Sequence, residues 1–233
     1  GRGIYANIKK AIHYLLSCNI GEILTIALAT LFRFPEMPLA PVQLLWLNLV
    51  TDSLPALALG VEPVEPGVMD QPPRQAGESL FAHGFAFRLV WQGVMVGLLT
   101  LAAYVLGAWV LPGCSLAVGS TMAFATLTLC QLFHAFDARS EEASIFKLGV
   151  TSNPAMNKAF LIGLAMQLAV LLVPPLQAVF STVPLSVSAW AAVAGLALTP
   201  VAVCEVTKAF RRSHRPGKRV SAPEAAAQRQ RNI

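Results

Sequence analysis

Six long apolar runs, separated by shorter polar segments, dominate the chain. They cover about residues 9–33, 42–61, 84–110, 118–138, 156–176 and 186–209. Each run is long enough for an α-helix to cross a hydrocarbon layer of about 30 Å, which takes about 20 residues. A soluble domain of this size would instead show amphipathic stripes. The pattern therefore predicts an all-α fold, a polytopic membrane bundle of six transmembrane helices.

The composition agrees with this class of protein. Of the 233 residues, 55% are hydrophobic and only 12% are charged, with a mean hydropathy of +0.61. Soluble domains carry about 25% charged residues. The four cysteines, Cys18, Cys114, Cys130 and Cys204, are scattered singly without a Cys-x-x-Cys pair or a companion histidine spacing. This scatter argues against a disulfide framework and against a thiolate metal site.

Basic residues mark one side of the predicted membrane domain. Of the 17 Lys and Arg residues, only Arg33 lies in a connection on the opposite side. Because Lys and Arg accumulate in cytoplasmic loops, both termini are expected in the cytoplasm. The net charge of +5 is then a topology signal, which implies a lipid bilayer as partner and no nucleic acid. Residues 1–210 form the membrane domain, and 211–233 read as a basic, disordered cytoplasmic tail.

The first predicted span contains a carboxylate at a depth where charge is costly. An ionisable group there costs about 2.5–3.5 kcal/mol on insertion scales, so such groups usually face the bundle interior and act there. Asn19 and Glu22 are spaced i, i+3 and share a helix face. Gly21, between them, lets another backbone approach closely.

The second predicted span has a similar polar face. Asn48, Thr51 and Asp52 are spaced i, i+3, i+4, and Pro55 follows. Pro55 cannot donate to the carbonyl of Thr51, so we expect a broken helix that lines a polar cavity. Carboxylate, amide and hydroxyl oxygens are ligands that calcium and manganese accept. The alternative is that these groups only hydrogen-bond the helices together.

The fourth predicted span carries further polar residues, at i, i+3, i+6. Asp137 is expected at the cytoplasmic end, and His134 can be either a ligand or a structural residue. Gln131 lies deeper and can supply one oxygen or bond a neighbour. Glu205, near the end of the last span, is interpreted as an interfacial partner for Lys208 or Arg211.

Several stretches resemble the P-type cation-transporting ATPases, most closely the calcium pumps of the sarcoplasmic-reticulum kind and their bacterial relatives. The stretches are GRGIYANIKK at 1–10, SCNIGE at 17–22 and PVQLLWLNLVTDSLPA at 41–56, continued by GVEP at 60–63 and MDQPPR at 69–74. The likeness is specific up to Arg74 and weaker, at the level of pattern, from there to about Lys208.

The resemblance implies that these six helices are the last six of ten. The chain begins with Gly1 rather than Met, with no leader before the first span, so we expect a fragment. Asp-Lys-Thr-Gly and Thr-Gly-Glu motifs and a phosphate-cradling glycine loop are all missing from it. It should therefore contain no catalytic residue. ATP and magnesium would act only through the N-terminal half and cytosolic domains of the same pump, a calcium-transporting ATPase.

The resemblance also implies a set of metal ligands. Asn48 and Asp52 would form one calcium site with a helix outside this chain. Asn19, Glu22, Thr51 and Asp52 would form a second site, with Gln131 where relatives place a glutamate. This departure implies one calcium ion per cycle, with Glu22 carrying a counter-transported proton. Ser53, where many relatives have glycine, is interpreted as a minor change.

Other functions stay open on the sequence. A manganese pump and a sodium or potassium pump are the rival P-type ATPases, and Asn48 and Glu22 favour calcium. A carrier or channel of six helices without ATPase domains is the alternative from another class. The expected location is the plasma membrane of a bacterium.

Overall fold

The computed structural model describes residues 1–63, 84–140, 144–149 and 151–214. These residues are helical wherever they have regular structure, and none of them forms a strand. The predictions for the loop that contains Arg74 and for the tail from residue 215 onward concern residues outside this description.

Six helices are long and apolar enough to cross a membrane, which confirms the predicted fold class. They are Arg2–Leu31 (α1), Pro41–Gly60, Phe85–Val110, Leu116–Asp137 (α5), Pro154–Leu172 (α7) and Val187–Phe210, within α9 (Val187–His214). The second comprises α2 (Pro41–Trp46), the π-helical turn η1 (Leu47–Thr51) and α3 (Ser53–Gly60). The third comprises α4 (Phe85–Val105) and a second π-helical turn, η2 (Leu106–Val110). Two short helices, α6 (Ile145–Leu148) and α8 (Pro174–Phe180), lie in the connections.

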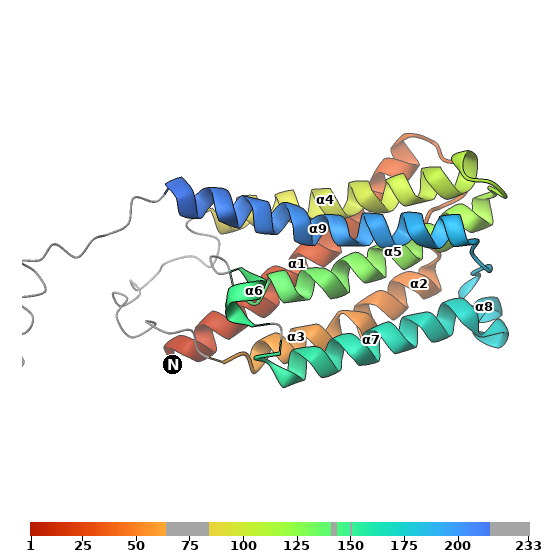
Figure 1. Cartoon of the computed structure of the whole chain (residues 1–233). Helices are drawn as coiled ribbons and strands as arrows, with labels where there is room; N and C mark the ends of the chain where they lie inside the picture. The colour runs from red at the N-terminus through yellow and green to blue at the C-terminus, as the bar shows by residue number, and fades with distance from the viewer. Residues whose placement is uncertain (64–83, 141–143, 150, 215–233) are drawn as a thin grey trace, which may run out of the picture.

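The spans lie side by side, and α1 begins at the same end of the bundle at which α9 ends (Figure 1). We call this the termini end and the opposite one the far end. Helix α5 is the most buried span and packs against α4, α7 and α9. Its Met122, Phe124 and Leu127 are fully buried in the main hydrophobic core. A second core lies between α1, α3, α5 and α7 around Tyr14 and Met156.

Glycines bring α1 and α4 close together. A Cβ on Gly93 would lie 2.5 Å from the Ile20 side chain and 2.9 Å from the Ser17 carbonyl oxygen. A Cβ on Gly97 would lie 3.0 Å from the carbonyl oxygen of Gly21. Small residues of this kind let membrane helices pack with their backbones in near contact. The expectation that another backbone approaches Gly21 closely is confirmed, since a Cβ there would lie 3.3 Å from the carbonyl oxygen of Gly93. This contact positions α1, and with it Glu22, against α4.

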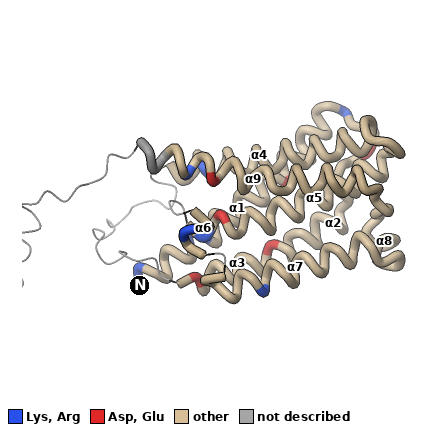
Figure 2. The backbone as a smooth tube through the Cα atoms, viewed as in Figure 1, with Lys and Arg blue, Asp and Glu red and all other residues tan. Residues whose placement is uncertain are grey.

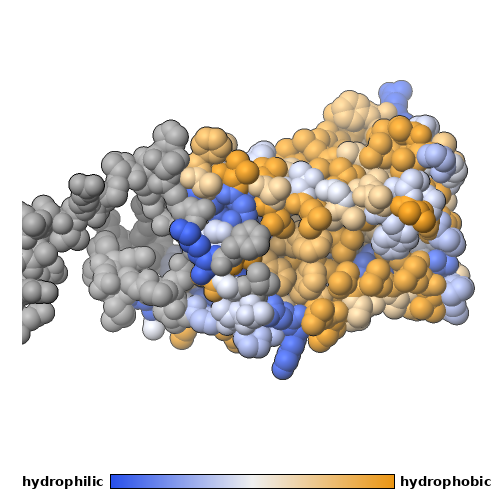
Figure 3. Space-filling model, viewed as in Figure 1, coloured by the Kyte–Doolittle hydropathy of each residue, from blue (hydrophilic) through white to orange (hydrophobic). Residues whose placement is uncertain are grey.

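Charged residues gather towards the termini end, and the rest of the bundle is mostly apolar on the face shown (Figures 2 and 3). Large apolar side chains point outward along the spans, among them Ile23, Leu49, Leu161 and Leu198, each more than half exposed. Such an exposed apolar band marks a surface that binds protein or membrane. Together with the lengths of the spans, it fits helices that face lipid.

Candidate cation site

The second span is broken where the polar residues lie. Asp52 donates its backbone N–H to the carbonyl of Leu47, five residues earlier, at 2.9 Å, which is the pattern of a π-turn. Pro55 has no N–H to offer to the carbonyl of Thr51, so the normal α-helical bond cannot form there. The predicted break thus takes the form of a π-helical turn that carries Asn48 and Thr51 and ends at Asp52.

Glu22 is the point at which three elements meet. Its Oε2 accepts a hydrogen bond from Asn48 Nδ2 at 2.7 Å, and its Oε1 accepts one from Gln131 Nε2 at 2.9 Å. These donors belong to η1 and α5, whereas Glu22 belongs to α1 and is only 5% exposed. The fold therefore brings three of the predicted ligands into direct contact.

Asp52 is more deeply buried than Glu22, at 1% exposure. Its Oδ1 accepts a hydrogen bond from the Tyr14 hydroxyl at 3.3 Å, and its Oδ2 has no hydrogen-bond partner in the described part of the chain. Thr51, also fully buried, donates its hydroxyl to the Leu47 carbonyl at 3.0 Å. The oxygen of Thr51 thus keeps its lone pairs for another partner.

Asn19 and Asn48 are placed less tightly. Asn19 is half-buried one turn before Glu22, and its side chain makes no hydrogen bond within the described residues. Asn48 is exposed and contacts Glu22, whereas the resemblance groups it with Asp52. The geometry thus joins Glu22, Asn48 and Gln131 by contact and leaves Asn19 apart from them.

The charge in this region is unbalanced. Within the described residues, neither Glu22 nor Asp52 lies within ion-pair distance of a Lys or Arg. A buried carboxylate must be neutralised by a proton or by a cation. Two oxygens of this region, Asp52 Oδ2 and Gln131 Oε1, are buried and have no hydrogen-bond partner among the described residues. Two acidic groups and oxygen-only donors are what a hard cation such as calcium requires.

Sequence reasoning missed Tyr14 as the partner of Asp52. Tyr14, Cys18, Glu22 and Thr25 are all buried on α1 at helical spacing, so they form one inward stripe. That spacing places Tyr14 two turns before Glu22 and is the signal that could have identified it. The spacing does not reveal that Tyr14 contacts Asp52, because this contact depends on how α1 packs against the second span.

Sequence reasoning also missed a buried polar cluster around Glu62, just after α3. Arg139 Nε donates to both carboxylate oxygens of Glu62, at 2.9 and 3.1 Å, and Asn153 Nδ2 donates to Oε2 at 2.5 Å. Asn7 Nδ2 donates to the backbone carbonyl of Glu62 at 2.7 Å. Arg139 and Glu62 are 1% and 6% exposed. The cluster therefore fastens the end of α3 to α1, to the end of α5 and to the start of α7.

The structure agrees with the predictions for Asp137 and Glu205. Asp137 is the last residue of α5 and pairs with Lys208 Nζ at 2.6 Å, as expected of a residue at the end of a span. Glu205, interpreted as a partner for Lys208 or Arg211, lies within ion-pair distance of Lys208, at 3.9 Å. Its carboxylate mainly accepts from Ser144 Oγ at 2.5 Å and Ile145 N at 3.1 Å, because it caps the start of α6.

A family comparison identifies the kind of protein to which these helices belong. The family described as "Cation transporting ATPase, C-terminus" matches residues 36–210, well over half of the chain. The chain belongs to this family. This confirms the resemblance that the first 74 residues suggested. With its six candidate spans, the cation-transporting ATPase segment is an integral membrane protein.

Individual relatives agree with the family. Calcium-transporting ATPase 1 of Bacillus cereus is 43% identical over 222 residues, which cover 89% of this chain and 25% of the relative. Calcium-transporting ATPase of Bacillus subtilis is 42% identical over 200 residues, with 86% and 22% covered. The human calcium-transporting ATPase type 2C member 1 is 34% identical over 213 residues, with 91% and 23% covered. This cation-transporting ATPase segment thus spans about a quarter of the length of these relatives.

Proposed function

We propose that the chain forms the cation-binding membrane part of an ATP-driven pump that moves calcium out of the cytoplasm. The observation that carries the proposal is the pair of buried carboxylates, Glu22 and Asp52, which no Lys or Arg neutralises within the described residues. Their neighbours offer amide and hydroxyl oxygens. Relatives named as calcium-transporting ATPases support the choice of ion.

The proposed ligands are Asp52, Asn48, Thr51, Asn19 and Glu22. Asp52 Oδ2 is the anchor because it is fully buried and no described residue is its hydrogen-bond partner. Gln131 contributes no charge, and its amide nitrogen donates to Glu22. One calcium ion per cycle follows, because a second divalent ion would need a further carboxylate. Glu22 would then bind a proton when the ion leaves, which gives counter-transport.

Transport requires two arrangements of these helices that differ in affinity for the ion, since coupling can shift an equilibrium only by that difference. ATP and magnesium would act through cytosolic domains of the same pump, outside these residues. Helix α1 begins at Arg2, well before its apolar stretch, and offers a mechanical link to those domains. The termini end then lies in the cytoplasm, the apolar band lies in a lipid bilayer, and the host membrane is the plasma membrane of a bacterium.

The substitution Asp52→Asn in the complete pump tests this proposal. It removes the buried charge at the anchor, so calcium-dependent phosphorylation from ATP should be lost. Glu36→Gln, at an exposed position in the far-end connection, is the matched control and should keep the phosphoenzyme level of the unchanged pump. Normal phosphoenzyme in Asp52→Asn at micromolar calcium would refute the site. If manganese but not calcium supported phosphorylation of the unchanged pump from ATP, the choice of calcium as the transported ion would be refuted.

A further inference from the structure

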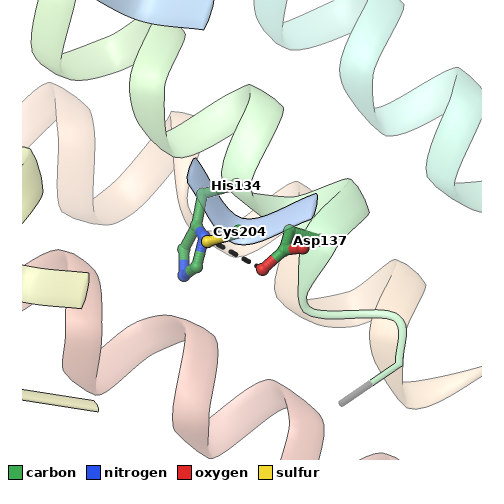
Figure 4. A group of neighbouring side chains, drawn as sticks. All are labelled: His134, Asp137 and Cys204. Carbon is green, nitrogen blue, oxygen red and sulfur yellow. Dashed lines mark ion pairs between the residues drawn. The ribbon is translucent and has the colours of Figure 1, made fainter. Parts of the chain in front are cut away.

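A second group of potential ligands lies away from the candidate cation site, towards the termini end. His134 and Asp137 from α5 and Cys204 from α9 converge, and one ligand atom of each lies within 4.8 Å of the other two (Figure 4). All three are buried, at 1%, 3% and 4% exposure. His134 and Cys204 belong to different spans, so their spacing along the chain does not predict that they meet.

The hydrogen bonds around His134 decide which of its nitrogens faces the group. The Ser17 hydroxyl donates to the Tyr14 carbonyl at 2.9 Å, so its oxygen can only accept from His134 Nε2, which lies 3.3 Å away. Neutral His134 then carries its proton on Nε2 and a lone pair on Nδ1. This Nδ1 is buried, has no hydrogen-bond partner among the residues that the structure describes, and lies 3.9 Å from Asp137 Oδ2. Two lone-pair atoms therefore face each other across a gap.

The other oxygen of Asp137 is already occupied. Lys208 Nζ lies 2.6 Å from Oδ1, which leaves Oδ2 to face His134. Gln92 lies beside the group, with Nε2 at 3.5 Å from both Asp137 Oδ2 and Cys204 Sγ. Its Oε1 is buried and has no hydrogen-bond partner in the described part of the chain. Rotation of the Gln92 amide would present this oxygen as a fourth ligand. Ligating carboxylates and imidazoles normally have such outer partners, here Lys208 and Ser17.

We propose that His134 Nδ1, Asp137 Oδ2 and Cys204 Sγ form a binding site for a thiophilic divalent cation of the zinc class. One nitrogen, one sulfur and one carboxylate oxygen are ligands that zinc prefers, whereas calcium takes oxygen ligands only. The site is thus distinct from the proposed transport site, and it does not rest on the proposed function. An ion held here would link α5 to α9.

The distances and charges are compatible with such an ion. Bonds of about 2.0–2.3 Å in a tetrahedron place ligand atoms about 3.5 Å apart. The three ligand atoms lie within 4.8 Å of one another, so the side chains must close by at most about 1.3 Å. Binding releases the thiol proton, and the resulting thiolate offsets one charge of the ion. A cavity of about 50 Å³ reaches two of the three ligands, Asp137 and Cys204, and Lys10, Arg88, Gln92 and Lys208 are among its other lining residues. The basic residues there oppose the ion and weaken its binding.

The test uses cadmium as probe with the complete pump in the Asp52→Asn background, so that the candidate cation site contributes little. Cadmium should give a thiolate charge-transfer absorption band that saturates at one equivalent of cadmium per pump. Cys204→Ser should abolish this band, whereas Cys114→Ser, at an exposed cysteine, should keep it. His134→Asn should weaken binding at least about tenfold, as the loss of a ligand or of its support does.

A second measurement needs no variant in the cluster and guards against misfolding of Cys204→Ser. Cobalt added to the same protein should give the visible spectrum of a tetrahedral site with sulfur ligation, and zinc should displace it. A cadmium band that persists in Cys204→Ser, or a cobalt spectrum of octahedral oxygen ligation alone, would overturn the proposal. Absence of either spectrum with the metals in large excess would also overturn the proposal. It would mean that His134 Nδ1 binds a proton and not a metal ion.

Discussion

Glu22 holds two amide groups that come from different helices. Asn48 and Gln131 each donate one N–H to it, so the carboxylate ties η1 to α5 through α1. Hydrogen bonds to a charged group contribute about 1.5–3 kcal/mol each, so the two donors stabilise the carboxylate of Glu22 when a bound cation balances its charge. Gln131 is therefore well placed to orient Glu22, whether or not its own oxygen ever coordinates the ion.

Replacing Gln131 tests its role in ion stoichiometry. Gln131→Glu adds a carboxylate next to Glu22 and should raise the number of calcium ions bound per pump from one to two. Gln131→Ala should leave the count at one, with little change in calcium affinity. Binding of radioactive calcium per phosphorylation site measures both. Two ions in the unchanged pump, or a loss of binding in Gln131→Ala as large as in Asp52→Asn, would contradict this interpretation.

Residue spacing predicted much at this scale, but only within single helices. Asn19 with Glu22, and Asn48 with Asp52, share faces because i, i+3 and i, i+4 positions do so in any helix. The partnership of Tyr14 with Asp52 depends instead on how α1 packs against α3. Local spacing cannot reveal such contacts between helices.

Helix α1 is positioned by its close contact with α4, and Gly93 is the tightest point of this contact. Gly93→Ala would drive a Cβ into Ile20 and the Ser17 carbonyl, so the helices must separate. Overpacking of this kind costs about 1–3 kcal/mol, and the variant should unfold at a lower temperature than the unchanged protein.

The control for this change is Gly195→Ala in α9, where a Cβ would meet nothing within 4 Å. It should unfold at the temperature of the unchanged protein or slightly above, because alanine favours helix more than glycine does. Thermal unfolding of the detergent-solubilised protein, followed by tryptophan fluorescence, compares the two variants. Equal unfolding temperatures would mean that α1 and α4 can move apart at no cost.

The elements themselves were predictable where they are long and apolar, and less so elsewhere. Helix α1 starts at Arg2, ahead of the predicted span that begins near residue 9, and Asn7 in this extension donates to the backbone carbonyls of Gly60 and Glu62. Pro174 lies near the end of the predicted fifth span, 156–176, yet α7 ends at Leu172 and Pro174 is the first residue of α8, a position that proline favours. Pro55 indicated a break in the second span, but not that the break would be a π-turn.

At the scale of the whole molecule, the distribution of charge specifies an orientation. The charged residues crowd towards the termini end, whereas the far end holds short connections such as Leu111–Ser115 (Figures 1 and 2). The positive-inside rule then predicts that the far end lies outside the cell. The sequence alone suffices for this prediction, because the rule depends on where Lys and Arg lie along the chain and not on how the helices pack.

Labelling of cysteines tests the orientation. Cys114 is exposed in a far-end connection, and the other three cysteines are buried. A membrane-impermeant maleimide should therefore label intact cells at Cys114, and Cys114→Ser should remove the signal. Lys147→Cys, an exposed position on α6 at the termini end, should be labelled only after permeabilisation in the Cys114→Ser background. The reverse pattern would place the termini outside.

The π-turn η1 also has a meaning for how such a site can arise. A π-turn contains one residue more than an α-helix needs for the same rise, so the span from Pro41 to Gly60 carries one surplus residue. Loss of a single residue there would close the wide turn while α2 and α3 keep their directions. The bond from the Asp52 N–H to the Leu47 carbonyl would be lost, and the residues of the turn, Asn48 and Thr51 among them, would change position relative to Glu22. The gain or loss of one codon is thus sufficient to change the geometry of this pocket.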